Sequence, residues 1–445
     1  MTREQPIKPH DHPVGDEAPP SREPATVRHA NETPRLEVIS SFDRLLSLRN
    51  DWELLVGEHG SVVESTWDFV TVWWRHFGEG RKSHSLHLVV CWVDAALVGI
   101  FPTYLFRGRV FGLVPLAEIR TIGDDIFSVS CHPKWRNRAW TLFLQHLGAV
   151  KGEWDVLRLR NVDFPIAVLS AYPADPPSND PAWTTRSAEP KPILHLPTSM
   201  AAYLKSRNSH FKSNLKRRHA KLSRIRTMGY EQINSADNFD RDYGDFLHLH
   251  IGRRLDFGDK SLFSKPDFAR YYQELTEVFL RKGLASLYFL KTDGRRCAVV
   301  LAFRKGSTLT TVLTGLKTDP EEHQCGPGIL LDTFVIEQSI NEGLTDIDYG
   351  RGVYPYKYEL GGLDQQATDL HASRRGLACL KSALYRGAEF LQNLTGLMVI
   401  EYRMLLAIIR ARGLLAPELR AHVRTRSAKA LARFRRSGTT STEGL

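Results

Sequence analysis

The chain has 445 residues, which is enough for two or three domains with ordinary hydrophobic cores. Hydrophobic residues make up 42% of the sequence and charged residues 25%, as is typical of a soluble globular protein. There is no run of about 18 uncharged apolar residues, and the first residues lack an apolar segment. We therefore expect neither a transmembrane helix nor a signal peptide.

The five cysteines are scattered, with no CxxC pair. This spacing argues against a disulfide framework and a structural zinc site, and it favours a reducing compartment. We expect a cytoplasmic protein without a bound metal. Cys325 stands apart because it precedes a predicted helix, where a thiolate would be stabilised. No His–Asp arrangement around Cys325 is visible in the sequence, so we favour a small packing residue over a nucleophile.

The net charge of +10 is spread unevenly along the chain. Residues 376–445 hold 12 Lys and Arg residues against 4 Glu, so most of the excess lies in this C-terminal tail. Apolar residues at helical spacing from Glu389 to Arg410 predict an amphipathic helix there. An anionic membrane surface, a nucleic acid or an acidic partner would each fit such a tail. We favour a solvated helical tail that packs on the body; attachment at the inner face of the membrane is the alternative for localisation.

The ordered body is expected to begin after a polar, Pro-rich and disordered segment of about 35 residues. Apolar periodicity predicts the elements that follow. They are a strand at 36–39, two helical patterns between 42 and 77, a hairpin at 85–106 with its turn at 94–96, a strand within 110–127, a helix at 138–151 and a strand at 154–160. We interpret the Trp residues of the two helical patterns as core.

The same order of elements returns after a Pro-rich connection at 173–197. The expected elements are helices at 200–228, 240–254 and 266–282, a hairpin at 286–303 with its turn at 293–294, a strand at 309–316, a helix at 329–340 and a strand at 345–350. The strand at 154–157 corresponds to the one at 345–348, roughly 190 residues later, which indicates two related α/β units. The predicted organisation is a tail at 1–35, domains at 36–190 and 191–375, and the basic tail at 376–445.

The chemistry is predicted to lie between residues 323 and 357. Gly326 and Gly328 bracket Pro327 directly before a predicted helix, so backbone N–H groups there can face an anion. The helix leads to a strand that ends in carboxylates, with Asp348 near its end, and then to a loop with tyrosines and a lysine. Only the second unit has this glycine turn, so only it is equipped for a phosphate ligand.

The six residues H-x-x-G-x-G at 323–328 resemble the pyrophosphate turn [QR]-x-x-G-x-[GA] of the GNAT acyltransferase superfamily, with His323 as a departure at the first position. Three further segments resemble the branch of that superfamily associated with the cellulose-biosynthesis protein CelD. They are FKSNLKRRHAKL at 211–222, LHIGR at 249–253 and D-Y-G-R-G-x-x-x-Y-K at 348–357. Together the resemblance covers residues 36–372.

The resemblance implies an α/β (α+β) fold of two tandem GNAT-like domains with mixed sheets flanked by helices, as in the Fem-type peptidoglycan aminoacyl transferases. It implies an acyltransferase that uses acetyl-CoA or another acyl-CoA as co-substrate. The acceptor would be an amine or hydroxyl on a small or carrier-linked molecule. The family association also points to exopolysaccharide or cell-envelope biosynthesis.

Two segments are expected to bind the CoA. N–H groups at a helix N-terminus attract anions, so the turn would hold the pyrophosphate. The turn residues are His323, Gln324, Cys325, Gly326, Pro327, Gly328 and Ile329. The preceding strand would pair with the pantetheine arm, and one of its N–H groups would polarise the thioester carbonyl. The strand residues are Leu313, Thr314, Gly315 and Leu316.

The loop after the second-unit strand supplies the candidate catalytic residues. Asp348 would bind or deprotonate the acceptor, and a structural carboxylate that holds the Arg351–Gly352 loop is an equal alternative. Tyr356 is the candidate general acid for the departing thiolate, with Tyr354 as its substitute. Lys357 would bind an acidic acceptor or a CoA phosphate, unless it forms a surface ion pair.

The acceptor is expected to be anionic. Residues 191–230 contain no Asp or Glu while Lys and Arg accumulate, and such a one-signed surface favours a sugar on a phosphate-linked lipid or nucleotide, with Arg207 among its contacts. Aromatic residues are sparse in this stretch, so double-stranded nucleic acid is disfavoured. His250 and Arg253, one helical turn apart, would line the acceptor cleft. For His250 alone, a structural role is the favoured interpretation.

Two other functions stay open at this stage. One is a Fem-type aminoacyl transferase that uses charged tRNA, which the basic helix after Ser206 would accommodate. The other is a non-catalytic binding module at a membrane surface that retains the fold. The glycine turn favours CoA over charged tRNA.

Overall fold

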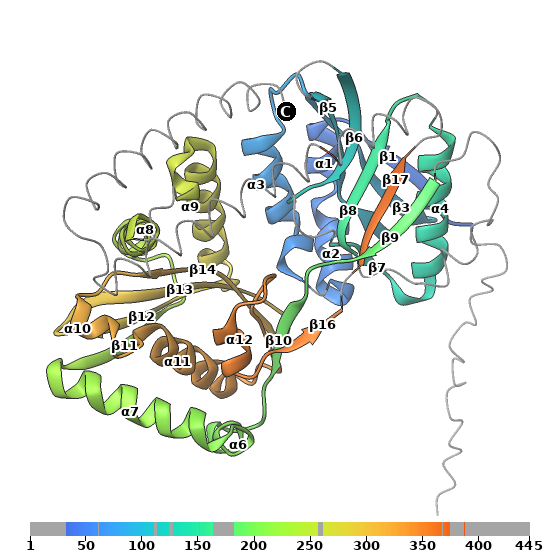
Figure 1. Cartoon of the computed structure of the whole chain (residues 1–445). Helices are drawn as coiled ribbons and strands as arrows, with labels where there is room; N and C mark the ends of the chain where they lie inside the picture. Colours follow the sequence, from blue (N-terminus) through green and yellow to red (C-terminus); the bar gives the residue numbers. More distant parts are fainter. Residues whose placement is uncertain are drawn as a thin grey trace, which may run out of the picture. The chain divides into compact units, whose positions relative to one another are not determined.

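A computed structural model gives the architecture of the chain (Figure 1). It describes residues 33–60, 62–110, 114–123, 128–150, 152–162, 182–256, 261–366 and 368–373, together with Gly387. Almost all of the expected N-terminal tail and, apart from Gly387, the whole basic C-terminal tail lie outside the described residues. The expectations for these tails therefore stay predictions.

The first half of the chain combines a group of helices, a run of short strands and a further helix, as its apolar periodicity predicts. Its elements are β1 Arg35–Ile39, α1 Phe42–Ser47, α2 Arg49–His59, the 3₁₀ helix η1 Val63–Ser65, α3 Trp67–Phe77, β2 His84–Leu86, β3 Leu88–Val93, β4 Ala96–Phe101, β5 Thr103–Val110, β6 Val114–Thr121, β7 Ser130–Cys131, η2 Pro133–Trp135, α4 Arg136–Ala149, β8 Val156–Val162 and β9 Ala182–Ser187. The Thr66 hydroxyl caps α3 by accepting a backbone N–H. Trp52, Trp73 and Trp74 are buried, so their expected place in the core is confirmed.

The second half contains longer helices and one large sheet. Its elements are β10 Lys191–His195, α6 Met200–Ser206, α7 Ser209–Ile225, β11 Met228–Ile233, α8 Phe239–Asp256, η3 Leu262–Ser264, α9 Pro266–Arg281, β12 Ala285–Thr292, β13 Arg295–Lys305, β14 Thr308–Leu316, α10 Pro320–His323, α11 Pro327–Asn341, β15 Asp346–Asp348, α12 Pro355–Glu359, β16 Leu363–Gln365 and β17 Thr368–Ser373. The expected helix at 329–340 is therefore α11, and the expected strand at 309–316 is β14.

The turns that punctuate these elements are the predicted ones. Asp94 and Asp293 have φ of 50° and 49°, as the first positions of tight hairpin turns require, and Gly294 follows with φ 78°. Helix α11 begins after Gly326 (φ 65°) and ends before Gly343 (φ 72°). These left-handed conformations explain why glycine stands at both ends of the helix.

The predicted repeat is visible in the pairing of the strands. In the first half β6 and β8 are parallel over Glu118–Arg120 and Val156–Arg158, and α4 lies between them in the chain. In the second half β14 and β15 are parallel over Thr308–Thr310 and Asp346–Asp348, and α11 lies between them. Each unit therefore contains one parallel pair joined by a helical crossover, as parallel pairing requires.

The second half contributes one strand to the sheet of the first half. The six-stranded sheet has the order β2-β5-β6-β8-β17-β9, so the last strand among the described residues lies inside the sheet of the first half, where Figure 1 shows it in orange. The seven-stranded sheet has the order β11-β12-β13-β14-β15-β10-β16, so β10 takes the corresponding place in the second half. The 173–197 connection therefore contains two strands that we did not expect. Likewise, β17 belongs to the first sheet although it falls within the range 191–375.

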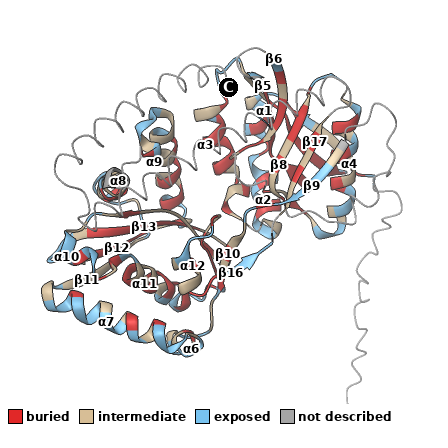
Figure 2. Cartoon of the chain, viewed as in Figure 1, coloured by how far each residue is buried: buried red, intermediate tan, exposed pale blue. Residues whose placement is uncertain are grey.

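The halves also share one hydrophobic core. Buried residues of α1–α3 and of α8, α9, β12 and β13 form a single cluster. Within it α3 packs on α9, and the rings of Phe77 and Phe268 are 4.8 Å apart. The Lys282 ammonium adds an ion pair at 2.5 Å to Asp68 of α3. Figure 2 shows how burial follows the sheets and inner helix faces, whereas the outer face of α7 is exposed.

Candidate active site

The parallel strands β14 and β15 separate after three residue pairs. Beyond Thr310 no described strand pairs with the outer edge of β14. The Lys317 N–H donates to Cys297 O at 2.9 Å, and since main-chain groups alternate along an antiparallel strand, Gly315 faces β13. The N–H and C=O groups of Thr314 and Leu316 consequently face the open edge. Of the four strand residues expected to bind the pantetheine arm, these two present their main chain there.

Helix α8 lies against this edge. His250 Nδ1–H donates to Thr314 O at 2.8 Å, and Arg253 donates to the Thr314 hydroxyl at 2.7 Å. At Gly315 a Cβ would stand 2.5 Å from His250 N and 2.7 Å from Leu249 C, so only glycine lets the helix backbone approach so closely. His250 is buried and holds helix to strand, in line with its structural interpretation, whereas half-buried Arg253 reaches the edge itself.

The glycine turn before α11 offers fewer N–H donors than we expected. The Gly326 N–H donates to His323 O at 3.1 Å, and the Ile329 N–H donates to Gly326 O at 3.2 Å. Pro327 has no N–H, so among the described residues Gly328 alone of this turn keeps its N–H without a backbone acceptor. Gly328 is exposed, and a Cβ there would meet no atom within 4 Å. Gly328 is therefore the residue of this turn whose N–H is available to a ligand.

The other members of the turn divide into exposed and buried residues. His323 and Gln324 are exposed at the end of α10, where Lys221 donates to the Gln324 side chain at 3.2 Å. Cys325 is fully buried, its Sγ contacts Glu321 O, and burial raises the pKa of its thiol. A raised pKa opposes thiolate formation, so Cys325 is a packing residue rather than a nucleophile.

Helix α7 brings positive charge to the turn. The Arg218 Nε would lie 3.0 Å from a Cβ at Gly326, so the guanidinium stands directly beside the turn, where it also pairs with Glu359 at 3.1 Å. Lys221, one turn further along α7, reaches Gln324. The basic stretch after Ser206 therefore brings its cations next to the N-terminus of α11.

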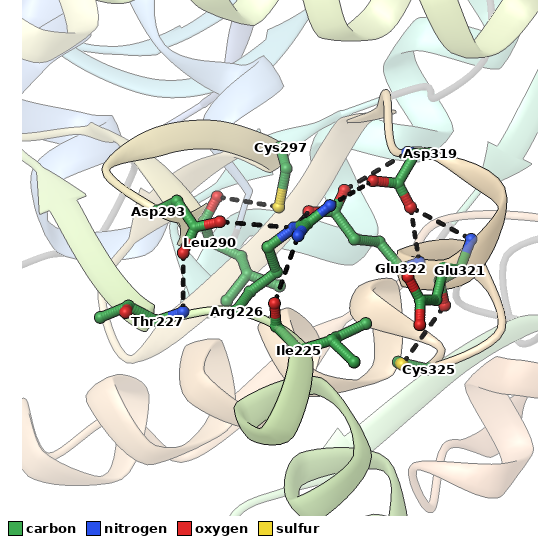
Figure 3. Close-up of polar contacts among 10 residues, drawn as sticks. All are labelled: Ile225, Arg226, Thr227, Leu290, Asp293, Cys297, Asp319, Glu321, Glu322 and Cys325. Carbon is green, nitrogen blue, oxygen red and sulfur yellow. Dashed lines mark hydrogen bonds and ion pairs between the residues drawn. The ribbon is translucent and has the colours of Figure 1, made fainter.

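Arg226, the C-cap of α7, forms ion pairs with three acidic side chains near the glycine turn (Figure 3). Its guanidinium lies 2.7 Å from Asp319, 3.0 Å from buried Glu322 and 3.4 Å from Asp293. Asp319 in turn caps α10 in a capping box with Glu322. One arginine thus joins α7, the β12–β13 turn and the helix that precedes Cys325, and it fixes where the glycine turn stands.

Asp348, the expected acceptor base, is engaged on both of its oxygens. Oδ1 accepts the Gly350 N–H at 2.8 Å, and Oδ2 lies 2.5 Å from the Lys191 ammonium. Only 3% of Asp348 is exposed. This geometry is that of the structural alternative, in which the carboxylate holds the loop after β15. Glu64 of the first half lies near this pair, and burial and the Asp348 charge raise the pKa of the Glu64 carboxyl.

The surroundings of Lys357 differ from those that the sequence predicts. We expected it to bind an acidic acceptor or a CoA phosphate, but it is 2% exposed and donates to Gly350 O at 2.9 Å and to Arg351 O at 2.6 Å. The Lys357 ammonium therefore stabilises the loop after β15 through these two hydrogen bonds. Tyr354 is 58% exposed at the N-cap of α12, and Tyr356 is half-buried behind it, with the two rings 6.3 Å apart.

Two polar residues near the loop were missed by the sequence reasoning. Nε and Nη2 of Arg351 are buried and have no hydrogen-bond partner among the described residues, and its nearest charge is Asp369 of β17 at 3.6 Å. Asp332 on α11 lies close enough to Arg253 and Tyr356 to interact electrostatically with both, and burial raises the pKa of its carboxyl to about 7. The signal for Asp332 was an acid in the first turns of an apolar helix pattern, directly after the buried Leu330 and Leu331.

Arg207, the expected acceptor contact, lies beside Gly361, where an added Cβ would meet its guanidinium. It lines a cavity of about 440 Å³ between α7 and α12, together with His210, Arg218, Tyr358 and Glu359. Because Arg218 also stands beside Gly326, this cavity adjoins the glycine turn. Within the described part of the chain, no cluster of three or more His, Cys, Asp or Glu residues could hold a metal ion. No helix in that same part is long and apolar enough to cross a membrane.

Comparison with known proteins agrees with this geometry. Residues 209–358, from α7 to α12, match the family model "Acetyltransferase (GNAT) domain". The chain carries a GNAT-type acetyltransferase domain. This match supports an acyltransferase, and it includes the glycine turn, the open edge of β14 and the loop after β15. No curated protein matches the sequence.

Solved structures resemble the chain over both halves. The crystal structure of FemX is 11% identical and covers 75% of this chain and 96% of its own, with a TM-score of 0.52. The C-terminal domain of a putative lysylphosphatidylglycerol synthetase from Agrobacterium fabrum is 10% identical over 76% and 96%, with a TM-score of 0.43. A tandem GNAT protein from the clavulanic acid biosynthesis pathway is 12% identical over 77% and 99%, with a TM-score of 0.38. The expected α/β fold of two GNAT-like units is confirmed.

Proposed function

We propose that the protein transfers an acyl group from acyl-CoA to an amine or hydroxyl acceptor. The observation that carries this proposal is the separation of β14 from β15 directly beside the N-terminus of α11. It leaves an edge of β14 without a strand partner next to the exposed N–H of Gly328. A CoA molecule has a diphosphate for this N–H and an amide-bearing arm for the edge, so both features fit one donor.

The residues around Gly328 suit a diphosphate. Gly328 supplies an N–H in open space at the positive end of α11, and Arg218 and Lys221 of α7 supply cations next to it. The 440 Å³ cavity lined by Arg207 and Arg218 adjoins the turn and would take a further anionic part of a substrate. We therefore expect Arg207 to bind the anionic part of the substrate in this cavity.

The edge of β14 would orient the thioester. Thr314 N–H faces the open edge and would donate to the thioester carbonyl, where negative charge develops as the acceptor attacks. Arg253, held by the Thr314 hydroxyl, adds positive charge at the same place. Tyr356 lies within electrostatic reach of Arg253, and the acceptor would enter past the loop that Asp348 and Lys357 hold in place.

A second candidate donor is charged tRNA. The fold likeness to FemX and the absence of any Asp or Glu between residues 191 and 230 favour it. The exposed basic face of α7 would lie against a nucleic-acid backbone. We rank it second because it gives no role to the glycine turn.

The narrower assignments rest on sequence motifs alone. The segments at 211–222, 249–253 and 348–357 support membership of the CelD-type branch and, through it, a role in exopolysaccharide or cell-envelope biosynthesis. We propose a cytoplasmic protein with a solvated basic tail at 376–445 that packs on the body, and contact of this tail with an anionic membrane surface is the alternative. Pelleting with anionic liposomes tests the tail: equal pelleting of the full chain and of a chain that ends at residue 375 would contradict the membrane contact.

Calorimetric titration with acetyl-CoA tests the donor. Gly328→Glu puts a carboxylate into the open space where the diphosphate would lie, and we expect at least a tenfold loss of affinity, about 1.4 kcal/mol. The matched control is Gly244→Glu, which adds the same side chain to an exposed, uncrowded position of α8 and should leave binding unchanged. No heat of binding with the wild-type protein at millimolar acetyl-CoA would contradict the proposal.

A further inference from the structure

Asp332 occupies a particular place on α11. It follows Gly328 by four residues, so the two lie on the same face of the helix one turn apart. The next residues along that face, Val335 and Ile336, are buried in the core of the second half. A donor whose diphosphate rests at Gly328 would therefore run its arm past the Asp332 carboxylate toward the open edge of β14.

Ionisable groups from four elements converge on this carboxylate. Arg253 of α8, Tyr203 of α6, Tyr349 after β15 and Tyr356 of α12 all lie within electrostatic reach of Asp332. Even so, no described residue donates a hydrogen bond to Asp332 or forms an ion pair with it. A half-buried carboxylate without a protein donor calls for an explanation, and a ligand is one.

We propose that Asp332 gives its proton to the sulfur of the departing coenzyme A. This inference rests on the proposed function, since it assumes a thioester donor. The acceptor nitrogen or oxygen attacks the carbonyl carbon, the new C–N or C–O bond forms and the C–S bond breaks. The sulfur then takes the proton of the neutral Asp332 carboxyl. The proton lost by the acceptor passes to water, and water returns one to Asp332, so the overall reaction is balanced.

Proton affinities favour Asp332 over the tyrosine that we expected in this role. Burial raises the pKa of Asp332 to about 7, with Arg253 as the nearby charge that opposes the rise. Burial raises the pKa of Tyr356 to about 12, and nearby Asp332 adds to the rise. An ordinary thiol has a pKa of about 8.5, so protonation of its thiolate is downhill from Asp332 and more than a thousandfold uphill from Tyr356. Tyr356 is then a hydrogen-bond donor that orients the reacting groups.

The surrounding charges set the pH dependence. Arg253 on α8 and Arg207 after α6 are the cations that interact with this cluster, and the tyrosines stay neutral up to high pH because burial raises their pKa values. Asp332 is thus the member of the cluster that titrates near neutrality. The rate of thioester cleavage should fall as pH rises through about 7, because only the protonated carboxyl can donate.

The test compares Asp332→Asn with the wild-type protein in cleavage of acetyl-CoA, with water as acceptor and free thiol as the readout, from pH 5.5 to 9. We expect a loss of at least tenfold at pH 6 and disappearance of the decline near pH 7, with CoA affinity within threefold by calorimetry. Glu337→Gln removes an exposed carboxylate from the same helix and is the matched control. The urea midpoint of Asp332→Asn should rise above the wild-type value at pH 8, since an ionised buried carboxylate is lost.

The outcomes separate the two proposals. If Asp332→Asn binds CoA and retains both the wild-type rate and its decline near pH 7, the role of Asp332 is overturned while the donor assignment stands. If the wild-type protein neither binds CoA nor releases thiol, the proposed function is overturned, and this inference with it.

Discussion

At the scale of single residues, two aspartates of the second half have opposite surroundings. Asp348 is buried with a lysine and a backbone N–H on its oxygens, and it serves the loop. Asp332 is half-buried, and among the described residues nothing donates to it. Strand alternation drew attention to Asp348, but the side chain that completes its ion pair comes from β10, more than 150 residues earlier in the chain. A sequence pattern identifies a carboxylate, whereas its partners decide whether it can do chemistry.

The Asp348–Lys191 pair gives a prediction about stability. Lys191→Met leaves a buried carboxylate without its cation, and we expect a loss of about 2–4 kcal/mol in the free energy of unfolding. Urea unfolding at pH 7 measures it. The double variant Lys191→Met with Asp348→Asn removes the charge that was left alone and should recover part of the loss. Equal instability of the single and double variants would contradict this account.

A second residue prediction concerns the contact between α8 and β14. Gly315→Ala would place a Cβ within 3.0 Å of three backbone atoms of Leu249 and His250, so the helix must move away from the strand. We expect a loss of about 2–4 kcal/mol, as for other overpacked contacts. Gly244→Ala, in open space on the same helix, should instead stabilise the protein by about 0.5–1 kcal/mol. Thermal unfolding of both variants checks the opposite signs.

At the scale of elements, apolar periodicity located most of the helices and strands but could not reveal their partners. The hairpins at Asp94 and Asp293, the helix between Gly326 and Gly343 and the strand β15 all stand where the sequence predicts them. The strands β9 and β10 were missed because prolines and polar residues interrupt their pattern. The place of β17 in the first sheet was also missed, because an alternating strand fits any sheet with one buried face.

The candidate site was also predictable only in part, because local sequence patterns mark single elements and not the contacts between them. Glycines that must adopt left-handed backbone or lie in open space mark the turn of α11 in the sequence itself. Long-range contacts carry no such local mark. The commitment of Lys357 to two carbonyls, the burial of His250 and the neighbours of Asp332 all depend on which elements meet in space.

At the scale of the whole molecule, β17 and the shared core tie the two halves together. Unfolding of the second half would remove β17 from the first sheet, and unfolding of either half would expose part of the common hydrophobic cluster. We therefore expect a single cooperative transition in calorimetry and no independently folding second half. Two separated transitions, or a folded fragment of residues 191–375, would contradict this coupling.

A pair of histidines in the first half should make the molecule sensitive to acid. The rings of His87, where β2 and β3 part into different sheets, and His146 of α4 stack at 5.5 Å. Nδ1 of His87 and Nε2 of His146 have no hydrogen-bond partner among the described residues. Burial, and secondarily the neighbouring His146, lowers the pKa of His87 from 6.5 to about 4. The neutral ring is therefore the form that the folded state prefers.

Because folding lowers the pKa of His87, the protein should lose stability as the pH falls. His87 contributes its full stabilisation above pH 6.5, and the contribution is lost as pH falls toward 4, for a total of roughly 3 kcal/mol. Urea midpoints measured from pH 7 to pH 4 should fall more steeply for the wild-type protein than for His87→Leu, which cannot titrate. Parallel curves for the two proteins would show that His87 does not govern the acid response.

The central claim is that coenzyme A binds across the N-terminus of α11 and the open edge of β14. Amide hydrogen exchange with and without saturating CoA tests it most directly, because exchange reports the protection of individual segments. We predict slower exchange in peptides that contain Thr314–Leu316 and Gly328–Asp332, with the first half unchanged. Protection confined to other segments, or no change at saturating CoA, would contradict the account.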